Sequence, residues 1–333
     1  MHRRGLMLGT TMLLPSLAVA QQAPPALPRL SDFPTRPIEL VVAFPAGGGM
    51  DVTARIIARH AERLTGQRFF VNNRTGGAGM VAHAYLARQA PSDGYTVGIV
   101  SSGVFADSML RARGLWSHAD VELAAFINFD PTNWIVSARG PMAGLSLAQI
   151  VSRARENPES IRISMLPESS SQFIIEQVER STGARFIKVP FQGGIPGMTA
   201  MLGGHIDIAT VFFSEYRSQL ESGGVRAVAV AGSERTASQP EVPTFNEVLG
   251  TQDVLWAAWR FAVVPKAVPA DRREYLSAVI RAAVADPDAQ REFTQTGVLL
   301  DPSLADPAKM NAAAAQLIST QQGFLRETGR IQP

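Results

Sequence analysis

The feature that most constrains the fold of this sequence is the alternation of short apolar runs with stretches of helical periodicity, which begins near residue 37. The apolar run Ile38–Phe44 is typical of a strand buried in a parallel sheet. A glycine turn follows, and Asp51–Leu64 then carries apolar residues at helical spacing. Because the pattern repeats, we predict an α/β fold of mainly parallel sheets, flanked by helices and joined by right-handed crossovers.

Two interruptions of this pattern predict a division into two lobes. The seams fall near Asp130–Trp134 and Thr251–Arg260, and a self-contained α/β set lies between them. We expect one lobe to comprise residues 36–130 and 258–333, and the other to comprise residues 131–257. Two crossing segments form a hinge, and the cleft between two hinged lobes is a common place for a ligand.

The N-terminal segment predicts export. Residues 1–20 hold Arg3 and Arg4, then an apolar stretch, and end in Ala-Val-Ala, which is the pattern of a cleaved signal peptide. Residues 21–35 are rich in Pro, Gln and Ala and predict an extended leader. Without Arg3 and Arg4, 29 basic residues face 29 acidic ones, and no basic stripe is visible. We therefore expect a soluble, exported protein that does not bind nucleic acid.

Metal and thiol chemistry are disfavoured by the residue types present. The chain has no cysteine, which excludes disulfides, thiolate metal sites and thiol nucleophiles. Its five histidines are scattered and form no paired metal-binding motif. We expect no metal and no cofactor.

The first candidate binding motif is the loop Phe44–Asp51, with three consecutive glycines at the carboxyl end of the first predicted strand. Glycines let the backbone approach a ligand closely, and free N–H groups at a helix start favour an anion. The alternative is a tight turn in which Asp51 only caps or orders the helix start. Neither this loop nor Gly77–Ala82 qualifies as a nucleotide motif, because the first lacks the P-loop lysine and the second lacks the acid that holds a ribose.

The second candidate motif is the serine-rich loop Ser164–Ser171, which follows the first strand of the second predicted lobe. Its hydroxyl and N–H groups at a helix start would repeat the chemistry of the first loop. Ser101 and Ser102 end another strand at the same edge. Signals of catalysis are weak, since Gly144–Ala148 departs from the nucleophile-elbow pattern and no SxxK occurs.

Six segments in order resemble the substrate-binding proteins of tripartite tricarboxylate transporters, also called Bug-type periplasmic receptors. They are FPTRPIELVVAFPAGGGMD (33–51), VNNRTGGAG (71–79), SDGYTVGIVSS (92–102), VPFQGGIPGMTAMLGGHIDIA (189–209), VRAVAVAGSERTASQPEVPTFNEV (225–248) and WRFAVVPKAVP (259–269). The resemblance implies a Venus-flytrap fold and a receptor that delivers small carboxylated compounds to a membrane permease with a large and a small subunit. We expect the receptor itself to be a monomer.

The resemblance also implies which residues hold the ligand carboxylate. The implied first-lobe contacts are Phe44, Ala46, Gly47, Gly48, Asp51, Ser101 and Ser102. The implied second-lobe contacts are Ser164, Ser169, Ser170, Ser171, Phe191, Gly193 and Gly194. The chain departs from the family pattern where Leu166 and Glu168 occupy positions that are normally glycine. A carboxylate at position 168 would repel an anion unless it points away, or unless the ligand is neutral, amide-like or cationic at that end.

These observations favour a non-enzymatic receptor that closes over a small organic acid or a related amide. One alternative is an exported α/β enzyme that uses the same cleft, although the sequence offers neither a nucleophile–base pair nor a nicotinamide site. Another alternative is a receptor that serves a membrane sensor rather than a permease.

Overall fold

The computed structural model describes residues 27–112, 114–252, 254 and 256–332. The predicted signal peptide (residues 1–20) and the first part of the predicted leader lie outside these residues. Residues 27–35 form no helix or strand. No helix in the described part of the chain is both long enough and apolar enough to span a membrane.

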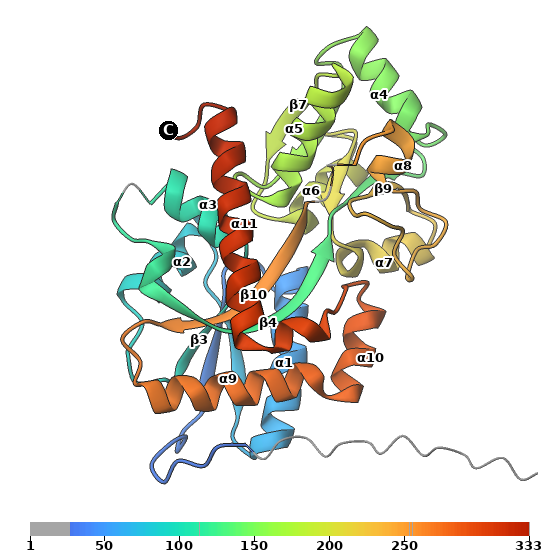
Figure 1. The fold of residues 1–333 in the computed structure, drawn as a ribbon. Helices are drawn as coiled ribbons and strands as arrows, with labels where there is room; N and C mark the ends of the chain where they lie inside the picture. The colour runs from blue at the N-terminus through green and yellow to red at the C-terminus, as the bar shows by residue number, and fades with distance from the viewer. Residues whose placement is uncertain (1–26, 113, 253, 255, 333) are drawn as a thin grey trace, which may run out of the picture.

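A five-stranded sheet organises the first group of elements, which we call lobe 1 (Figure 1). Its order is β2-β1-β3-β10-β4, with strands β1 (Ile38–Val42), β2 (Phe69–Asn73), β3 (Thr96–Ser101), β4 (Val121–Pro131) and β10 (Ala257–Pro265). The β1 strand pairs in parallel with β2 and β3, whereas β10 is antiparallel to β3 and β4. The α/β class is confirmed, but the sheet is mixed rather than mainly parallel.

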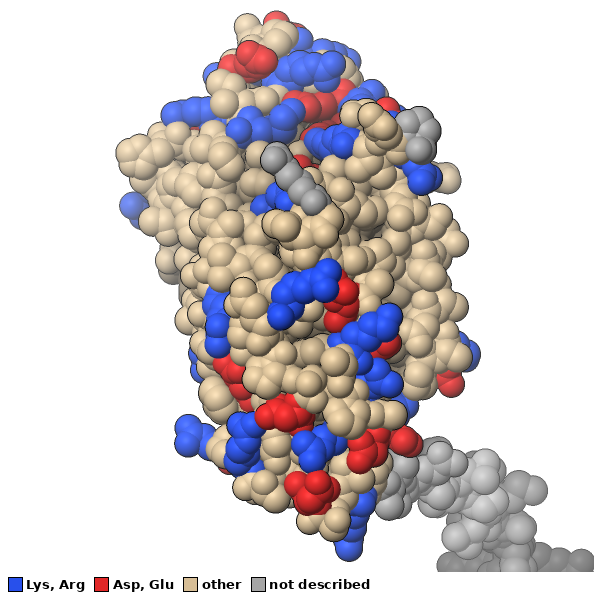
Figure 2. All heavy atoms as spheres, turned by 90° about the vertical axis from the view of Figure 1, so that its left-hand side faces the viewer, with Lys and Arg blue, Asp and Glu red and all other residues tan. Residues whose placement is uncertain are grey.

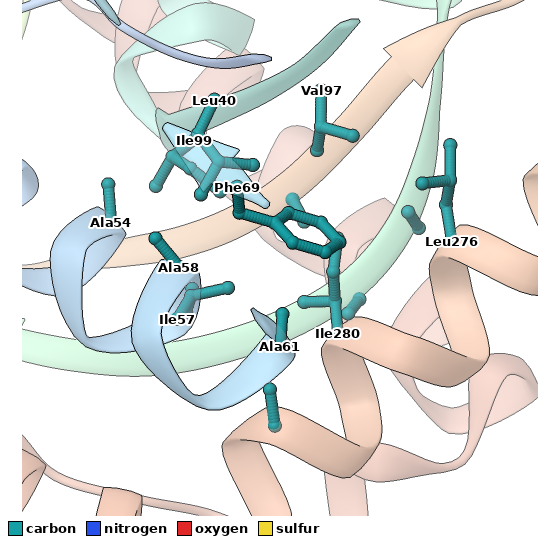
Figure 3. Packing of buried hydrophobic residues seen from close by; sticks show 14 of the residues in the cluster. Leu40, Ala54, Ile57, Ala58, Ala61, Phe69, Val97, Ile99, Leu276 and Ile280 are labelled. Carbon is teal, nitrogen blue, oxygen red and sulfur yellow. The ribbon is translucent and has the colours of Figure 1, made fainter. Parts of the chain in front are cut away.

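Helices cover both faces of this sheet. Because successive strand residues face opposite sides, Leu40 packs with Ile57 and Ile280 on one face, while Val41 packs with Leu86 and Phe105 on the other. Figure 3 shows the first of these clusters around Phe69. Burying each large apolar side chain contributes about 1.5–3 kcal/mol. The covering helices are α1 (Gly49–Thr65), α9 (Ala270–Ala285) and α10 (Pro287–Gln295) on the first face, and α2 (Met80–Arg88), α3 (Gly103–Leu110) and α11 (Pro307–Glu327) on the second.

The second group of elements, which we call lobe 2, has a smaller and also mixed sheet arrangement. β5 (Asn133–Ser137) lies antiparallel between β8 (Ala209–Val211) and β9 (Val225–Val230), and β6 (Arg162–Met165) pairs in parallel with β7 (Ile187–Pro190). A single bridge between Ile163 and Ile208 joins the two sets. The helices are α4 (Leu147–Glu156), α5 (Ser170–Thr182), α6 (Gly194–Leu202), α7 (Phe213–Glu221) and α8 (Phe245–Leu249).

Two strands carry the chain between the lobes, and this explains the mixed pairing. β4 leads directly into β5 through Thr132, and β10 brings the chain back into lobe 1. β3 ends at the cleft side of the sheet, whereas β10 begins there, so the two neighbours run in opposite directions. Antiparallel neighbours do not need the helical crossover that joins consecutive parallel strands. The residue boundaries of the lobes stay a prediction.

The last helix makes a further contact between the lobes. α11 extends from lobe 1 toward α5 of lobe 2 (Figure 1). The Phe324 ring lies 5.2 Å from the Phe173 ring, centroid to centroid, and Leu325 belongs to the same buried cluster. Beyond the helix, Arg330 pairs with Glu176. The C-terminal segment therefore holds α5 by both apolar and ionic contacts.

Charges on the face shown in Figure 2 are of both signs and lie at its two ends and in a group near its centre. Uncharged residues cover much of the surface between these groups, and no continuous basic stripe crosses the face. This distribution agrees with the even balance of basic and acidic residues in the sequence without its first 20 residues.

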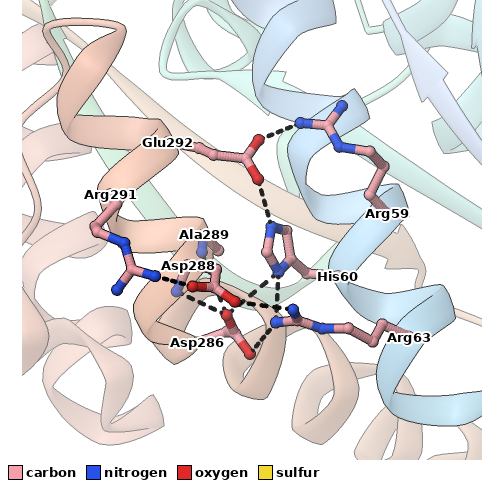
Figure 4. Close-up of polar contacts among 8 residues, drawn as sticks. All are labelled: Arg59, His60, Arg63, Asp286, Asp288, Ala289, Arg291 and Glu292. Atoms are coloured by element: carbon pink, nitrogen blue, oxygen red, sulfur yellow. Dashed lines mark hydrogen bonds and ion pairs between the residues drawn. The ribbon is translucent and has the colours of Figure 1, made fainter.

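An ionic network joins α1 to α10 on the surface of lobe 1 (Figure 4). Arg63 bridges Asp286 and Asp288, at 2.5 Å and 2.9 Å, and His60 Nε2 lies 2.9 Å from Oε1 of Glu292. Asp286 also caps α10 by accepting hydrogen bonds from the N–H groups of Asp288 and Ala289. Partial burial tends to raise the pKa of Asp286. Hydrogen bonding to Arg63 and to the helix N–H groups outweighs burial and lowers this pKa below its usual value.

A comparison of two helix caps tests this network. Asp306 caps α11 in the same way, before a proline, and no ion pair of Asp306 is present among the described residues. We expect Asp306→Ala to lower the free energy of unfolding by about 1 kcal/mol, the usual value of a cap. Asp286→Ala should cost more because it also removes the partner of Arg63. The excess should shrink in 1 M salt, which screens exposed charges. Urea denaturation measures both; equal losses at low salt would contradict a stabilising role for the network.

Candidate functional site

A cavity lies between the two lobes, at the carboxyl ends of β1, β3 and β6. Counting its open mouth, it encloses about 800 Å³. Ligands of open α/β sheets bind outside the carboxyl ends of the strands. The cavity is lined by Phe44, Pro45, Gly48, Gly49, Met50, Ser101, Ser102, Gly103, Thr132, Leu166, Ser169, Ser170, Ser171, Gly193, Gly194, Ile195, Pro196, Thr210, Val211, Phe212, Glu215 and Ala258.

Two pairs of loops face each other across this cavity. The glycine loop of lobe 1 faces the start of α6, since a Cβ placed on Gly47 would lie 3.8 Å from Ile195 Cδ1. The loop after β3 faces the serine loop of lobe 2, since a Cβ placed on Gly103 would lie 3.8 Å from the Glu168 carbonyl oxygen. Each wall of the cavity therefore combines main chain from both lobes.

The first loop is ordered by Asp51, which does not line the cavity. Its buried carboxylate accepts hydrogen bonds from the Gly47 N–H at 2.9 Å, from Arg55 at 2.8 Å and from the Asn73 amide at 3.0 Å. Burial works against ionisation, but these bonds prevail and lower the pKa of Asp51. The left-handed backbone of Gly47, with φ of 81°, completes the turn and favours glycine.

The three glycine N–H groups do not form the free anion cradle that the sequence predicts. The Gly47 N–H donates to Asp51, and the Gly48 N–H donates to the Pro45 carbonyl at 3.2 Å. The Gly49 backbone lies near the Glu215 carboxyl and favours its charged form. Gly48 and Gly49 still meet the cavity, but the N–H groups of Gly47 and Gly48 are engaged within the protein.

Gly49 lies against a buried ion pair at the hinge. Arg260 of β10 binds Asp130 of β4, and its Nη1 donates to Thr53 of α1 at 2.6 Å. Both charged side chains are buried. Burial raises the pKa of Asp130 to about 6, against the attraction of the Arg260 guanidinium. A Cβ on Gly49 would come within 2.6 Å of Arg260 Nη2, so the absence of a side chain at residue 49 lets the pair form.

Glu215, at the third position of α7, is the one ionisable residue among those that line the cavity. Its Oε2 accepts a hydrogen bond from the Phe212 N–H at 2.9 Å. Burial raises the pKa of Glu215 to about 7, although the backbone hydrogen bonds and Arg260 act in the opposite direction. Asp130 contributes to the rise by repulsion.

Hydroxyl groups supply most of the remaining polarity of the cavity. Ser170 Oγ lies 3.0 Å from Thr132 Oγ1, which joins the start of α5 to the hinge. Ser169 caps α5 by accepting from the Ser171 N–H at 3.2 Å, and Ser171 Oγ accepts from the Leu166 N–H at 2.9 Å. The serine loop is therefore held by its own hydrogen bonds, at a helix start that favours an anion.

Nine of the fourteen predicted contacts line the cavity: Phe44, Gly48, Ser101, Ser102, Ser169, Ser170, Ser171, Gly193 and Gly194. Ala46, Gly47, Asp51, Ser164 and Phe191 are not among the lining residues. Ala46 and Gly47 are exposed, and Phe191 is half-buried against the lobe 2 core. Ser164 is buried and its Oγ accepts from the Thr210 N–H at 2.9 Å, which ties β6 to β8.

Glu168 also lies outside the cavity lining. Its backbone is left-handed, with φ of 55°, a conformation that favours glycine, and the resemblance implies glycine at this position. Its Oε2 is buried and has no hydrogen-bond partner among the described residues. Burial raises the pKa of this carboxyl, and Arg330 partly offsets the rise. The side chain is thus directed away from the cavity, in the electrostatic field of Arg330.

Four polar or aromatic lining residues were not predicted from the sequence: Thr132, Thr210, Phe212 and Glu215. Thr132 lies between β4 and β5, and Glu215 follows the last residue of β8, Val211, by four residues. A polar residue just beyond the carboxyl end of a strand was the signal available for Glu215.

Alanine at neighbouring glycines tests how tightly the loop packs. A Cβ at Gly48 meets no atom closer than 3.2 Å, and its φ of −70° suits any residue. A Cβ at Gly49 would overlap the Arg260–Asp130 pair. We expect Gly49→Ala to lower the free energy of unfolding by about 1–3 kcal/mol, as overpacking does, and Gly48→Ala to cost clearly less. Urea denaturation decides, and equal losses would contradict the packing argument.

Comparison with known proteins places this site in a family. The model of the tripartite tricarboxylate transporter family receptor matches residues 53–329. A protein from the tcbD–tcbE intergenic region of Pseudomonas sp. strain P51 is 31% identical over 275 residues, which are 81% of this chain and 80% of that protein.

Solved structures agree. The structure of Rpa4515 from R. palustris with adipate has a TM-score of 0.82 and 26% identity, and the match covers 90% of this chain and 99% of that one. The periplasmic binding protein BugD has a TM-score of 0.81 at 24% identity, with 89% of this chain and 99% of that one covered, which shows the shared fold. These matches confirm the periplasmic-binding-protein fold and the resemblance seen in the sequence. The chain belongs to the tripartite tricarboxylate transporter family of solute-binding receptors.

Proposed function

We propose that this receptor captures a small carboxylated organic compound in the cavity between the lobes, in the periplasm, and delivers it to a tripartite tricarboxylate-type permease. The observation that carries the proposal is the cavity itself, whose walls combine a serine-rich helix start from lobe 2 with the strand ends of lobe 1. The relative solved with adipate supports the ligand class.

The carboxylate would be held at the serine loops rather than at the glycine triplet. Ser101 and Ser102 approach from lobe 1, and Ser170 approaches from the first turn of α5. Hydroxyl groups and helix N–H groups can donate to an anion without a full positive charge. Because the donors come from both lobes, the ligand binds the closed form better and shifts the equilibrium toward closure.

Binding without turnover is the role that the lining residues support. Within the described residues, no hydroxyl of a lining serine is hydrogen-bonded to a histidine or a carboxylate. Acyl transfer by serine needs such a base to activate the hydroxyl. We therefore propose a monomeric receptor that releases its ligand unchanged to the large and small subunits of the permease.

Ligand screening by thermal shift tests the proposed function. Mono-, di- and tricarboxylates and their amides should be added to the mature protein. A ligand at 100 times its Kd stabilises the folded state by about 2.7 kcal/mol, so at least one compound should raise the melting temperature by several degrees. If no carboxylate or amide raises it, the proposed function is wrong.

Serine substitutions test where the carboxylate binds. We expect Ser101→Ala and Ser170→Ala each to weaken the binding of a ligand found in the screen by about tenfold, the effect of losing a hydrogen bond to a charged group. Ser152→Ala is the control, because Ser152 is half-buried on α4 outside the cavity, where its Oγ donates to Glu156. Isothermal titration calorimetry gives the three affinities. Unchanged affinity in both cavity variants would show that these serines do not bind the carboxylate.

A further inference from the structure

Glu215 is a carboxylate inside a cavity that belongs to a family of carboxylate receptors. No lysine, arginine or histidine is among the lining residues, so Glu215 is the one group there that can carry a charge. A ligand that fills the cavity therefore meets this acid without a lining cation to offset it.

Main chain from both lobes encloses the Glu215 carboxyl. A Cβ on Gly48 of lobe 1 would lie 3.4 Å from Oε1, and any side chain at Gly194 of lobe 2 would overlap Oε2. The Phe212 N–H donates to Oε2, and the Gly49 backbone lies near the carboxyl. Gly48 and Gly194, which the resemblance implies as contacts of a ligand carboxylate, thus already enclose a carboxyl of the protein.

The charged groups around Glu215 are engaged elsewhere. Arg260 of β10 is paired with Asp130 of β4, and Asp51 of α1 is paired with Arg55. In β9, Arg226 donates to main-chain carbonyls, and α6 contains no ionisable residue. On α7 itself, Arg217 pairs with Glu221. Among the described residues around Glu215, each arginine named here is therefore already bound to a carboxylate or to main-chain carbonyls.

We propose that Glu215 selects the ligand class: a compound with one carboxylate, held by the serine loops, and a hydrogen-bond donor such as an amide or ammonium group directed at Glu215. The inference rests on the proposed function and narrows it. A dicarboxylate would bring a second negative charge against Glu215 and would bind well only when Glu215 holds a proton. Since burial raises the pKa of this carboxyl to about 7, that condition is met below neutral pH and lost above it.

A matched set of ligands tests the selection. Adipate, its monoamide and 6-aminohexanoate place a carboxylate, an amide or an ammonium group at the same distance from the first carboxylate, and the glutarate series provides shorter equivalents. At pH 8.5 we expect the amide or the amino acid to bind at least about tenfold tighter than the diacid, which corresponds to about 1.4 kcal/mol. At pH 5.5 the preference should shrink.

Two variants separate Glu215 from a general effect of charge. Glu215→Gln keeps an oxygen that accepts from the Phe212 N–H but removes the charge. At pH 8.5 this variant should therefore lose the preference for the amide or amino acid over the diacid, mainly because it binds the diacid more tightly. Glu247→Gln is the control: Glu247 is also the third residue of its helix, where it accepts from the Thr244 N–H at 3.0 Å, and it lies outside the cavity. This control should behave as the unchanged protein.

The outcomes distinguish the two proposals. Binding of carboxylates with no preference at pH 8.5, or a preference that survives Glu215→Gln, overturns the role of Glu215 and leaves the receptor function standing. Binding of no carboxylate or amide by the unchanged protein or by Glu215→Gln overturns the receptor function, and the selection with it.

A ligand-free measurement gives independent evidence. A carboxyl whose pKa is higher in the folded than in the unfolded protein stabilises the fold below its unfolded pKa, and this stabilisation is lost as pH rises through the folded value. The melting temperature of Glu215→Gln relative to the unchanged protein should therefore rise between pH 5 and pH 8.5. A constant difference would show that Glu215 is already ionised at pH 5, which contradicts the pH dependence of the selection.

Discussion

The buried pair of Arg260 and Asp130 is the contact on which the geometry of the cleft depends. Arg260 belongs to the strand that returns to lobe 1, and Asp130 belongs to the strand that leaves it. Thr53 of α1 accepts from the same guanidinium. A buried charge that loses its partner costs several kcal/mol, so the two crossing strands and the start of α1 are held in one arrangement, and the glycine loop is fixed with them.

This arrangement gives the glycine residues a structural role in place of the predicted ligand-binding role. Gly49 is small so that the guanidinium can lie beside it, and Gly194 is small so that the Glu215 carboxyl can. The close approach that glycine permits is used by groups of the protein itself. In the function proposed here, an anion is recognised by hydroxyl groups and by the start of α5, through neutral and directional hydrogen-bond donors.

The fold was largely predictable from the sequence, but the site was predictable only in part. Alternating apolar runs predicted the α/β class, and local chemistry predicted the serine loop and the turn at Gly47. The antiparallel course of β10 was not predictable, because a strand pattern carries no direction. Neither was the position of Glu215, whose partners Gly48 and Gly194 are distant in the chain and meet it only after both lobes have folded. Asp51 shows the same limit, since an acid at a helix start can face a ligand or its own loop.

The C-terminal segment limits how the two lobes can move apart. Two crossing strands alone would form a hinge that can open widely. Phe324 and Arg330, however, also contact α5 through an aromatic pair and an ion pair. Opening of the cleft must either pull this aromatic contact apart or carry the end of α11 along with lobe 2. In the first case, the free energy needed to separate the two aromatic rings stabilises the closed conformation even when no ligand is bound. In the second case, the lobes rotate about a hinge axis near α11, and the cavity opens on the side away from this helix.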